Sequence, residues 1–150
     1  MSGDSEDLIV AASRQFSLDG FMYYTVGNGP NEPTHVGQLR LSFAGEAPTM
    51  QQAHGVGPID VMFSCVKQHA LARDLLPDGL QLTDYVLHAK MGETDGSKSP
   101  AMIRVRLQYN GHQAIGEATN RDILIASINA LVAAANNLLN PSKAPAVSNI

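Results

Sequence analysis

A glycine loop that runs into a predicted helix offers the clearest chemistry in this sequence. It reads His54-Gly55-Val56-Gly57-Pro58-Ile59-Asp60. Its glycines let the backbone turn sharply and approach another group closely, and proline is favoured at the first position of a helix. The N–H groups of Ile59 and Asp60 then point out of the helix start, which makes a small anion-binding site. A plain loop-to-helix junction has the same local pattern, so both interpretations stay open.

A second predicted helix start carries related residues. Asp122 and Ile123 open an apolar helix, with Asn120 as its expected N-cap. Asp60 and Asp122 then either stabilise a helix dipole, by roughly 0.3–1 kcal/mol each, or contact a ligand. Glu117 and Arg121 are expected to add a carboxylate and a guanidinium near this second start. If the protein is an enzyme, its acid–base candidates are Asp60, His88, Glu117 and Asp122.

The remaining reactive residues indicate no metal or cofactor site. The five histidines show no i, i+4 spacing of the kind that binds zinc on a helix. Cys65 is the only cysteine, so the sequence has no disulfide framework. We expect Cys65 to be a small buried residue in a helix, and we expect no bound metal or cofactor.

Composition bounds the possible functions further. The 150 residues suit one domain, and 44% of them are hydrophobic. A net charge of −4 gives no basic footprint for nucleic acid. No apolar run approaches the roughly 20 residues that span a bilayer, and acidic residues precede the first apolar stretch, unlike a signal peptide. We therefore expect a cytoplasmic protein that binds neither nucleic acid nor membrane.

The hydrophobic pattern predicts the elements that position these residues. Strands are expected at 16–26, 36–43 and 49–54, followed by a helix at 58–72, with a loop at 27–33. Further strands are expected at 80–89, 101–109 and 112–119, followed by a helix from 121 or 122 to 139, with a polar loop at 92–100. Alternating side chains mark the strand at 101–109 most clearly, and Asn110-Gly111 predicts a two-residue hairpin after it.

The two halves share one order of elements and one phrase. Leu39-Arg40-Leu41-Ser42-Phe43-Ala44-Gly45 matches Val105-Arg106-Leu107-Gln108-Tyr109-Asn110-Gly111. This predicts an α+β fold of two pseudo-repeated βββα units, 16–76 and 80–140, each an antiparallel sheet with a packed helix. Flexible segments are expected at 1–15 and 141–150. The internal pseudo-two-fold would let the two helix starts face one cavity.

Several short pieces, in this order and spacing, resemble one family. They are Tyr24-x-Val26-Gly27-Asn28, Gly55-Val56-Gly57-Pro58-Ile59-Asp60, Leu82-Thr83-Asp84-Tyr85, His88-Ala89-Lys90, Tyr109-Asn110-Gly111 and Asp122-Ile123. The chain from 16 to 139 is similar to the C-terminal allosteric (dimerisation) domain of 2-isopropylmalate synthase, shared with citramalate synthase. The sequence has no counterpart of that family's catalytic barrel, and its second glycine loop reads Gly116-Glu117-Ala118.

The resemblance implies a homodimer that binds leucine or isoleucine near the dimer interface and thereby inhibits a catalytic barrel. Carried onto matching positions, the ligand site comprises Gly57, Pro58, Ile59, Asp60, Leu82, Tyr85, Ala89, Ser99, Ile103, Asp122 and Ile123. We expect a regulatory domain that senses a small amino-acid-like metabolite, either beside a separately encoded synthase or as an excised domain. Two alternatives remain: a small cyclase, isomerase or proton-transfer enzyme that uses the former effector pocket, and a dimerisation module with a vestigial pocket.

Overall fold

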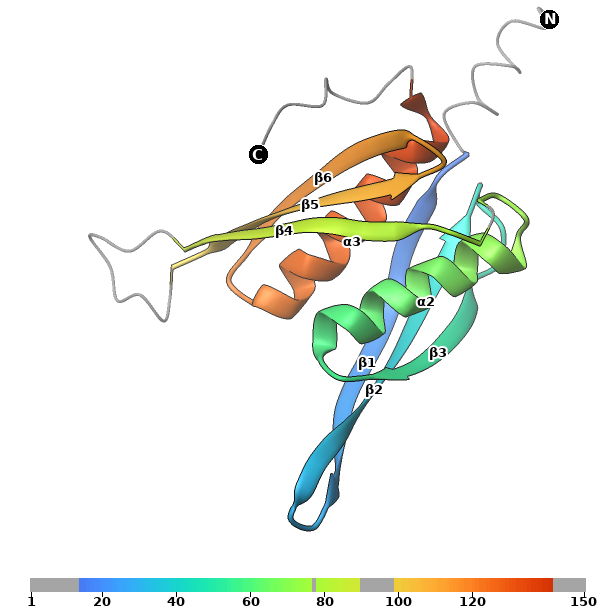
Figure 1. The fold of residues 1–150 in the computed structure, drawn as a ribbon. Coiled ribbons are helices and arrows are strands. Elements are labelled where there is room, and N and C mark those ends of the chain that lie inside the picture. Colours follow the sequence, from blue (N-terminus) through green and yellow to red (C-terminus); the bar gives the residue numbers. More distant parts are fainter. Residues whose placement is uncertain (1–13, 77, 90–98, 142–150) are drawn as a thin grey trace, which may run out of the picture.

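Two consecutive βββα units make up the chain (Figure 1). The structure, a computed structural model, describes residues 14–76, 78–89 and 99–141. The first unit comprises β1 (Phe16–Asn28), β2 (Asn31–Phe43), β3 (Thr49–Gly55) and α2 (Pro58–Ala72). The second comprises β4 (Gln81–Ala89), β5 (Ala101–Tyr109), β6 (His112–Asn120) and α3 (Ile123–Leu139). The predicted α+β class and the repeated order are thus confirmed, while the expected flexible ends and most of the 92–100 loop lie outside the described residues.

Each unit builds an antiparallel three-stranded meander, in the orders β1-β2-β3 and β4-β5-β6. The central strands alternate as predicted, because successive side chains of a strand point to opposite faces. Leu39 and Leu41 of β2 are fully buried while Arg40 between them is exposed. On β5 the buried positions are Ala101, Ile103, Val105 and Leu107. One face of each sheet therefore belongs to the core.

The two helices cover these core faces and touch each other. α2 packs on β2 and β3, and α3 packs on β5 and β6 and also reaches β1. The amide of Asn136 on α3 accepts a hydrogen bond from Phe16 N at 2.7 Å and donates one to Phe16 O at 3.0 Å. This amide thus ties α3 to the first strand of the other unit. Independently of it, buried apolar residues of both units form one hydrophobic cluster, so the two units share a core.

The first hairpin is longer than the sequence pattern predicts. The expected loop at 27–33 is wrong: β1 and β2 stay paired as far as Asn28 and Asn31, which leaves only a tight turn at Gly29-Pro30. Glycine and proline in this stretch are typical of loops. Register shifts after Leu18 and Val26 let the irregular sequence remain in the ladder.

The repeated phrase ends in the same backbone conformation in both units. Ala44 and Gly45 have φ values of 53° and 75°, and Asn110 and Gly111 have values of 50° and 80°. Two successive left-handed residues form the type of turn that joins hairpin strands with the correct twist. The Asn110-Gly111 hairpin is therefore confirmed, and Ala44-Gly45 is its counterpart in the first unit.

Candidate functional site

The start of α2 has the open geometry that its sequence predicts. Gly57 is the N-cap and has no side chain to accept from the helix-start N–H groups, and Pro58 takes the first helical position. The carboxylate of Asp60 reaches back, and its Oδ2 accepts a hydrogen bond from Val56 N at 3.0 Å. A Cβ on Gly55 would lie 2.0 Å from the same oxygen. Any side chain at position 55 would therefore displace the Asp60 carboxylate from its present position.

A surface groove begins at Asp60 and runs between α2 and β4. Its volume is about 560 Å³. The helix contributes Asp60, Phe63 and Lys67, at the i, i+3 and i+7 spacing that aligns side chains on one face. The segment leading into β4 and its first residues form the opposite wall with Leu80, Gln81, Leu82 and Thr83. The groove therefore lies between the two units, with one wall from each.

The chemistry of this groove suits a small zwitterion with an apolar tail. Asp60 supplies an exposed carboxylate at one end, and Lys67 supplies an ammonium whose Nζ lies 5.8 Å from the centre of the Phe63 ring. Neither charge takes part in an ion pair with another residue that the structure describes. Phe63 and Leu82 are partly exposed and supply apolar surface to the same groove, which the buried Leu80 also lines.

The start of α3 differs from that of α2, because the side chain of its N-cap residue already accepts hydrogen bonds from the N–H groups of the first turn. Asp122, and not the predicted Asn120, is the cap: Asp122 Oδ1 accepts from Leu124 N at 2.8 Å and from Ile125 N at 3.1 Å. Asn120 instead accepts from Asp122 N at 2.9 Å. The predicted cap lies two residues too early, since both residue types are good caps. A ligand carboxylate would have to displace the Asp122 carboxylate to reach these N–H groups.

Three other expected site residues, Tyr85, Ile123 and Ile103, belong to the second sheet and its helix. The hydroxyl of Tyr85 on β4 is 2.9 Å from Ser127 Oγ on α3, which joins the second sheet to its helix. Ile123 is 47% exposed at the start of α3. Ile103 is fully buried in the core, so its side chain has no exposed surface for a ligand in this structure.

The far end of β4 forms a separate hollow. It is lined by His88, Ala89, Pro100, Met102 and Thr119, with the buried Ser99 next in the chain to Pro100. Leu82 and Ala89 are seven strand residues apart, or about 23 Å at the usual rise per residue. One small ligand cannot touch both, so the expected site residues divide between two hollows.

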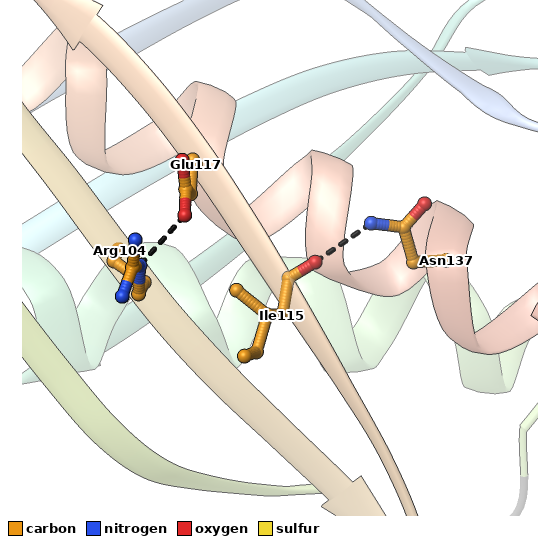
Figure 2. Close-up of polar contacts among 4 residues, drawn as sticks. All are labelled: Arg104, Ile115, Glu117 and Asn137. Carbon is orange, nitrogen blue, oxygen red and sulfur yellow. Dashed lines mark hydrogen bonds and ion pairs between the residues drawn. The ribbon is translucent and has the colours of Figure 1, made fainter. Parts of the chain in front are cut away.

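The acid–base candidates of the enzyme alternative do not converge. Glu117 Oε1 accepts from Arg104 Nε at 2.6 Å across β5 and β6 (Figure 2). Neighbouring Gly116 faces α3, where a Cβ would lie 2.1 Å from Ala130 O, so Glu117 points to the opposite face of the sheet. Figure 2 shows Asn137 of α3 reaching instead the backbone oxygen of Ile115, at 2.7 Å. Glu117 is therefore paired with Arg104 on the sheet face that points away from α3.

Two core groups have shifted pKa values. Burial raises the pKa of the Cys65 thiol to about 11, although a backbone hydrogen bond at Ala53 opposes the shift. Burial also lowers the pKa of His69, against a hydrogen bond to Leu39 O and with a contribution from the charge of Arg73. Both side chains are buried in the layer between α2 and its sheet. Neither group lines a hollow described above.

The described residues were compared with the requirements of a metal cluster and of a membrane-spanning helix. Within residues 14–76, 78–89 and 99–141, no three histidine, cysteine or acidic side chains gather in a way that could hold a metal ion. None of the helices in these ranges is long and apolar enough to cross a membrane.

Sequence reasoning missed part of the groove at α2. Phe63, Lys67, Leu80, Gln81 and Thr83 line it beside the expected Asp60 and Leu82. The signal for the helical members was present, because Asp60, Phe63 and Lys67 fall on one helix face. No local pattern indicates that the segment from Leu80 to Thr83 lies opposite this face, since that pairing depends on how the two units pack.

Comparisons with known proteins agree with the architecture. The sequence profile described as the LeuA allosteric (dimerisation) domain matches residues 6–139. The 2-isopropylmalate synthase of Caulobacter sp. (strain K31) is 35% identical over 102 residues, which cover 68% of this chain and 18% of that protein. The 2-isopropylmalate synthases of Nitrobacter winogradskyi and Rhodopseudomonas palustris (strain HaA2) are 30% and 27% identical over 134 residues, covering 89% of this chain and 23% of each relative. The chain thus spans about a fifth of the length of these relatives.

Proposed function

This chain belongs to the family of the LeuA allosteric (dimerisation) domain, and we propose that it is a homodimeric regulatory domain that binds a small branched-chain amino acid or a close analogue. The observation that carries the ligand class is the groove between α2 and β4, where a carboxylate, an ammonium and apolar side chains line one surface. The second helix start is capped by its own aspartate, so the ligand's charged groups bind at α2.

Each part of the ligand has a matching group in the groove. The free oxygen of the Asp60 carboxylate accepts the ligand ammonium, while Oδ2 remains bonded to Val56 N. Lys67, seven residues further along the helix, lies about 10.5 Å away along the axis. Its flexible four-carbon stem lets the ammonium reach back to the ligand carboxylate. The aliphatic tail rests on Phe63, Leu80 and Leu82, where burying a leucine side chain contributes about 1.5–3 kcal/mol.

Regulation follows if the ligand prefers one arrangement of the two units. The groove has one wall on each unit, so a ligand that touches both favours the arrangement in which the walls are at the right distance. A ligand shifts such an equilibrium only by its difference in affinity between the two states. The receiver of this change is a 2-isopropylmalate synthase-type catalytic domain, either in a separate chain or in a longer one.

Ligand titrations of matched variants test this proposal. Calorimetric titration with leucine, isoleucine, valine and their 2-oxo acid counterparts measures the affinities. Asp60→Asn keeps an acceptor for Val56 N but removes the charge, and we expect it to weaken amino-acid binding about 10- to 100-fold, in line with hydrogen bonds to charged groups. Asp74→Asn is the control, because Asp74 is an exposed carboxylate with φ of 56°, a conformation that asparagine also tolerates.

The 2-oxo acids separate the roles of the two charges. They keep the carboxylate and the branched tail but lack the ammonium. We therefore expect them to bind the wild-type protein at least about tenfold more weakly than the amino acids, and to be little affected by Asp60→Asn. At a ligand concentration about 100 times the expected Kd, binding should raise the free energy of unfolding by about 2.7 kcal/mol. If none of these compounds stabilises the wild-type protein at such concentrations, the proposed ligand class is contradicted.

A further inference from the structure

A tyrosine and a histidine form a pair on the first sheet. The hydroxyl of Tyr23 on β1 is hydrogen-bonded to Nδ1 of His35 on β2, and the two rings stack with their centres 5.9 Å apart. Both side chains are half-buried, and they lie outside the set of residues that lines the groove between α2 and β4. The contact occupies Nδ1 of the imidazole, so Nε2 is the ring nitrogen that remains for another group.

The face of the sheet that carries this pair is the one that α2 covers. A Cβ on Gly37 would lie 2.3 Å from Val61 Cγ1, so position 37 faces the first turn of α2. His35 is two residues from Gly37 on β2, and Tyr23 is paired with Gly37 across the ladder, so both side chains share that face. The other strand beside His35 is β3, which leads through a short loop into α2 (Figure 1), so the pair lies at the end of the sheet where the helix begins.

The carboxylate of Asp60 lies on the β3 side of His35, whereas Tyr23 lies on the β1 side. His35 is paired directly with Gly55 of β3, and the Cβ atoms of residues paired in this way are about 4.5–5.5 Å apart. Asp60 Oδ2 lies 2.0 Å from the position that a Cβ on Gly55 would take. This oxygen is therefore within about 7.5 Å of His35 Cβ, which brings the imidazole and the carboxylate into the range where the charge of one acts on the other.

We propose that His35, held by Tyr23, positions the Asp60 carboxylate and that this carboxylate accepts the ammonium of an amino acid only while the imidazole is neutral. A neutral imidazole has one N–H donor and one acceptor nitrogen. When Nδ1 accepts from the Tyr23 hydroxyl, the donor is Nε2, which can hold the carboxylate without cancelling its charge. The inference rests on the amino-acid site in the proposed function and adds the group that controls its charge.

Protonation of the ring acts against the ligand. An imidazolium beside Asp60 offsets the charge of the carboxylate, and it places a second positive charge next to the ligand ammonium. In the described part of the chain, the titratable groups that face His35 are Tyr23 from β1 and Asp60 from α2, while the residue opposite it on β3 is Gly55. Histidine side chains change charge between pH 5 and 8, so the affinity for an amino acid should fall as the pH drops through this range.

Calorimetric titration of the whole chain with leucine, isoleucine and valine between pH 5.5 and 7.5 tests this role. For a histidine that titrates near pH 6.5, a site that binds only beside the neutral ring loses about tenfold in affinity over this range. Because proton and ligand then exclude each other, about half a proton per bound ligand is released at pH 6.5. The number of protons released is obtained from the binding enthalpies in two buffers that have different heats of ionisation.

Two histidine variants separate this role from other effects of pH. His35→Gln keeps a side-chain N–H donor but cannot titrate, so we expect its affinity to vary little with pH and its proton release to be close to zero. His54→Gln is the matched control. His54 is exposed and directly precedes Gly55 on β3, so its side chain points to the opposite face of the sheet. This control should keep the pH profile and the proton release of the wild type.

Each outcome decides a different claim. If none of the three amino acids binds at any pH, the proposed function and this inference are both overturned. If they bind and His35→Gln shows the same pH profile and proton release as the wild type, the role of His35 alone is overturned. If His35→Gln does not fold, the histidine ring signals in NMR spectra of the labelled wild type decide. A pH titration of the His35 ring that changes when leucine is bound supports the role, and an unchanged titration overturns it.

Discussion

Exchanging residues between the two hairpin turns tests the duplicated architecture. Ala44 and Asn110 occupy equivalent positions before a glycine, with φ values of 53° and 50°. The left-handed conformation costs an ordinary L-residue roughly 1–2 kcal/mol, and asparagine adopts it more readily because its side chain bonds locally. Ala44→Asn should therefore stabilise the protein, and Asn110→Ala should destabilise it.

The structure sets the size of both effects. The Cβ of residue 44 is kept in Ala44→Asn, as is the hydrogen bond from its N–H to Gln15 O at 3.2 Å. Asparagine recovers part of the conformational cost, so we expect a gain of about 0.5–1 kcal/mol, and a similar loss for Asn110→Ala. In a domain of this size 1 kcal/mol shifts the melting temperature by roughly 2–4 °C.

Urea unfolding at one fixed protein concentration measures both variants, because the stability of the proposed dimer would depend on concentration. The double variant Ala44→Asn/Asn110→Ala should return close to the wild-type value, since distant sites usually add. A loss of stability in Ala44→Asn, or no change in Asn110→Ala, would refute the view that the two turns are strained in the same way.

Three further predictions concern the core. His69 Nε2 contacts Leu39 O at 2.7 Å, Nδ1 has no partner in the described part of the chain, and burial lowers the pKa of the imidazole below its ordinary value of about 6.5. Because the unfolded state then binds the proton more readily, stability should fall as the pH drops below about 6.5. His69→Gln keeps the donor to Leu39 O and should reduce this loss in urea titrations at several pH values, whereas equal pH slopes for the variant and the wild type would contradict it. Gly116→Ala places a Cβ 2.1 Å from Ala130 O and should lower the free energy of unfolding by about 1–3 kcal/mol or more. Gly20→Ala, whose added Cβ meets no atom within 4 Å, serves as the control in the same unfolding assay. Cys65, whose pKa is raised to about 11, should resist alkylation by iodoacetamide near neutral pH until the protein unfolds. Mass spectrometry follows the alkylation, and rapid modification of the folded protein would contradict the prediction, because it would show that the thiol is accessible.

Most of the fold follows from local patterns in the sequence. From Ile103 to Tyr109 the apolar and polar side chains of β5 alternate, so strand and buried face could both be read from it. The start of α2 combines glycine, proline and an acidic first turn, and each of these acts within a few residues of the helix. The same holds for the Asn110-Gly111 turn. These features need no information about the distant chain.

The errors arise where the outcome depends on a neighbouring strand or unit. Glycine and proline at positions 27–33 are typical of loops, yet the strands remain paired because a bulge absorbs the irregularity. Glu117 is close in sequence to Asp122 but points to the opposite face of the sheet, which its alternation with the buried Gly116 decides. The groove has one wall from each unit, so residues such as Lys67 and Leu80 meet only in the folded protein.

A titration of isotopically labelled protein with leucine, followed residue by residue in amide NMR spectra, tests the central claim most directly. We expect saturable shifts that centre on Asp60, Phe63, Lys67 and Leu82 and that are lost in Asp60→Asn. Shifts centred instead on Ala89, Met102 and Thr119 at the far end of β4, or no shifts at millimolar leucine, isoleucine and valine, would contradict it.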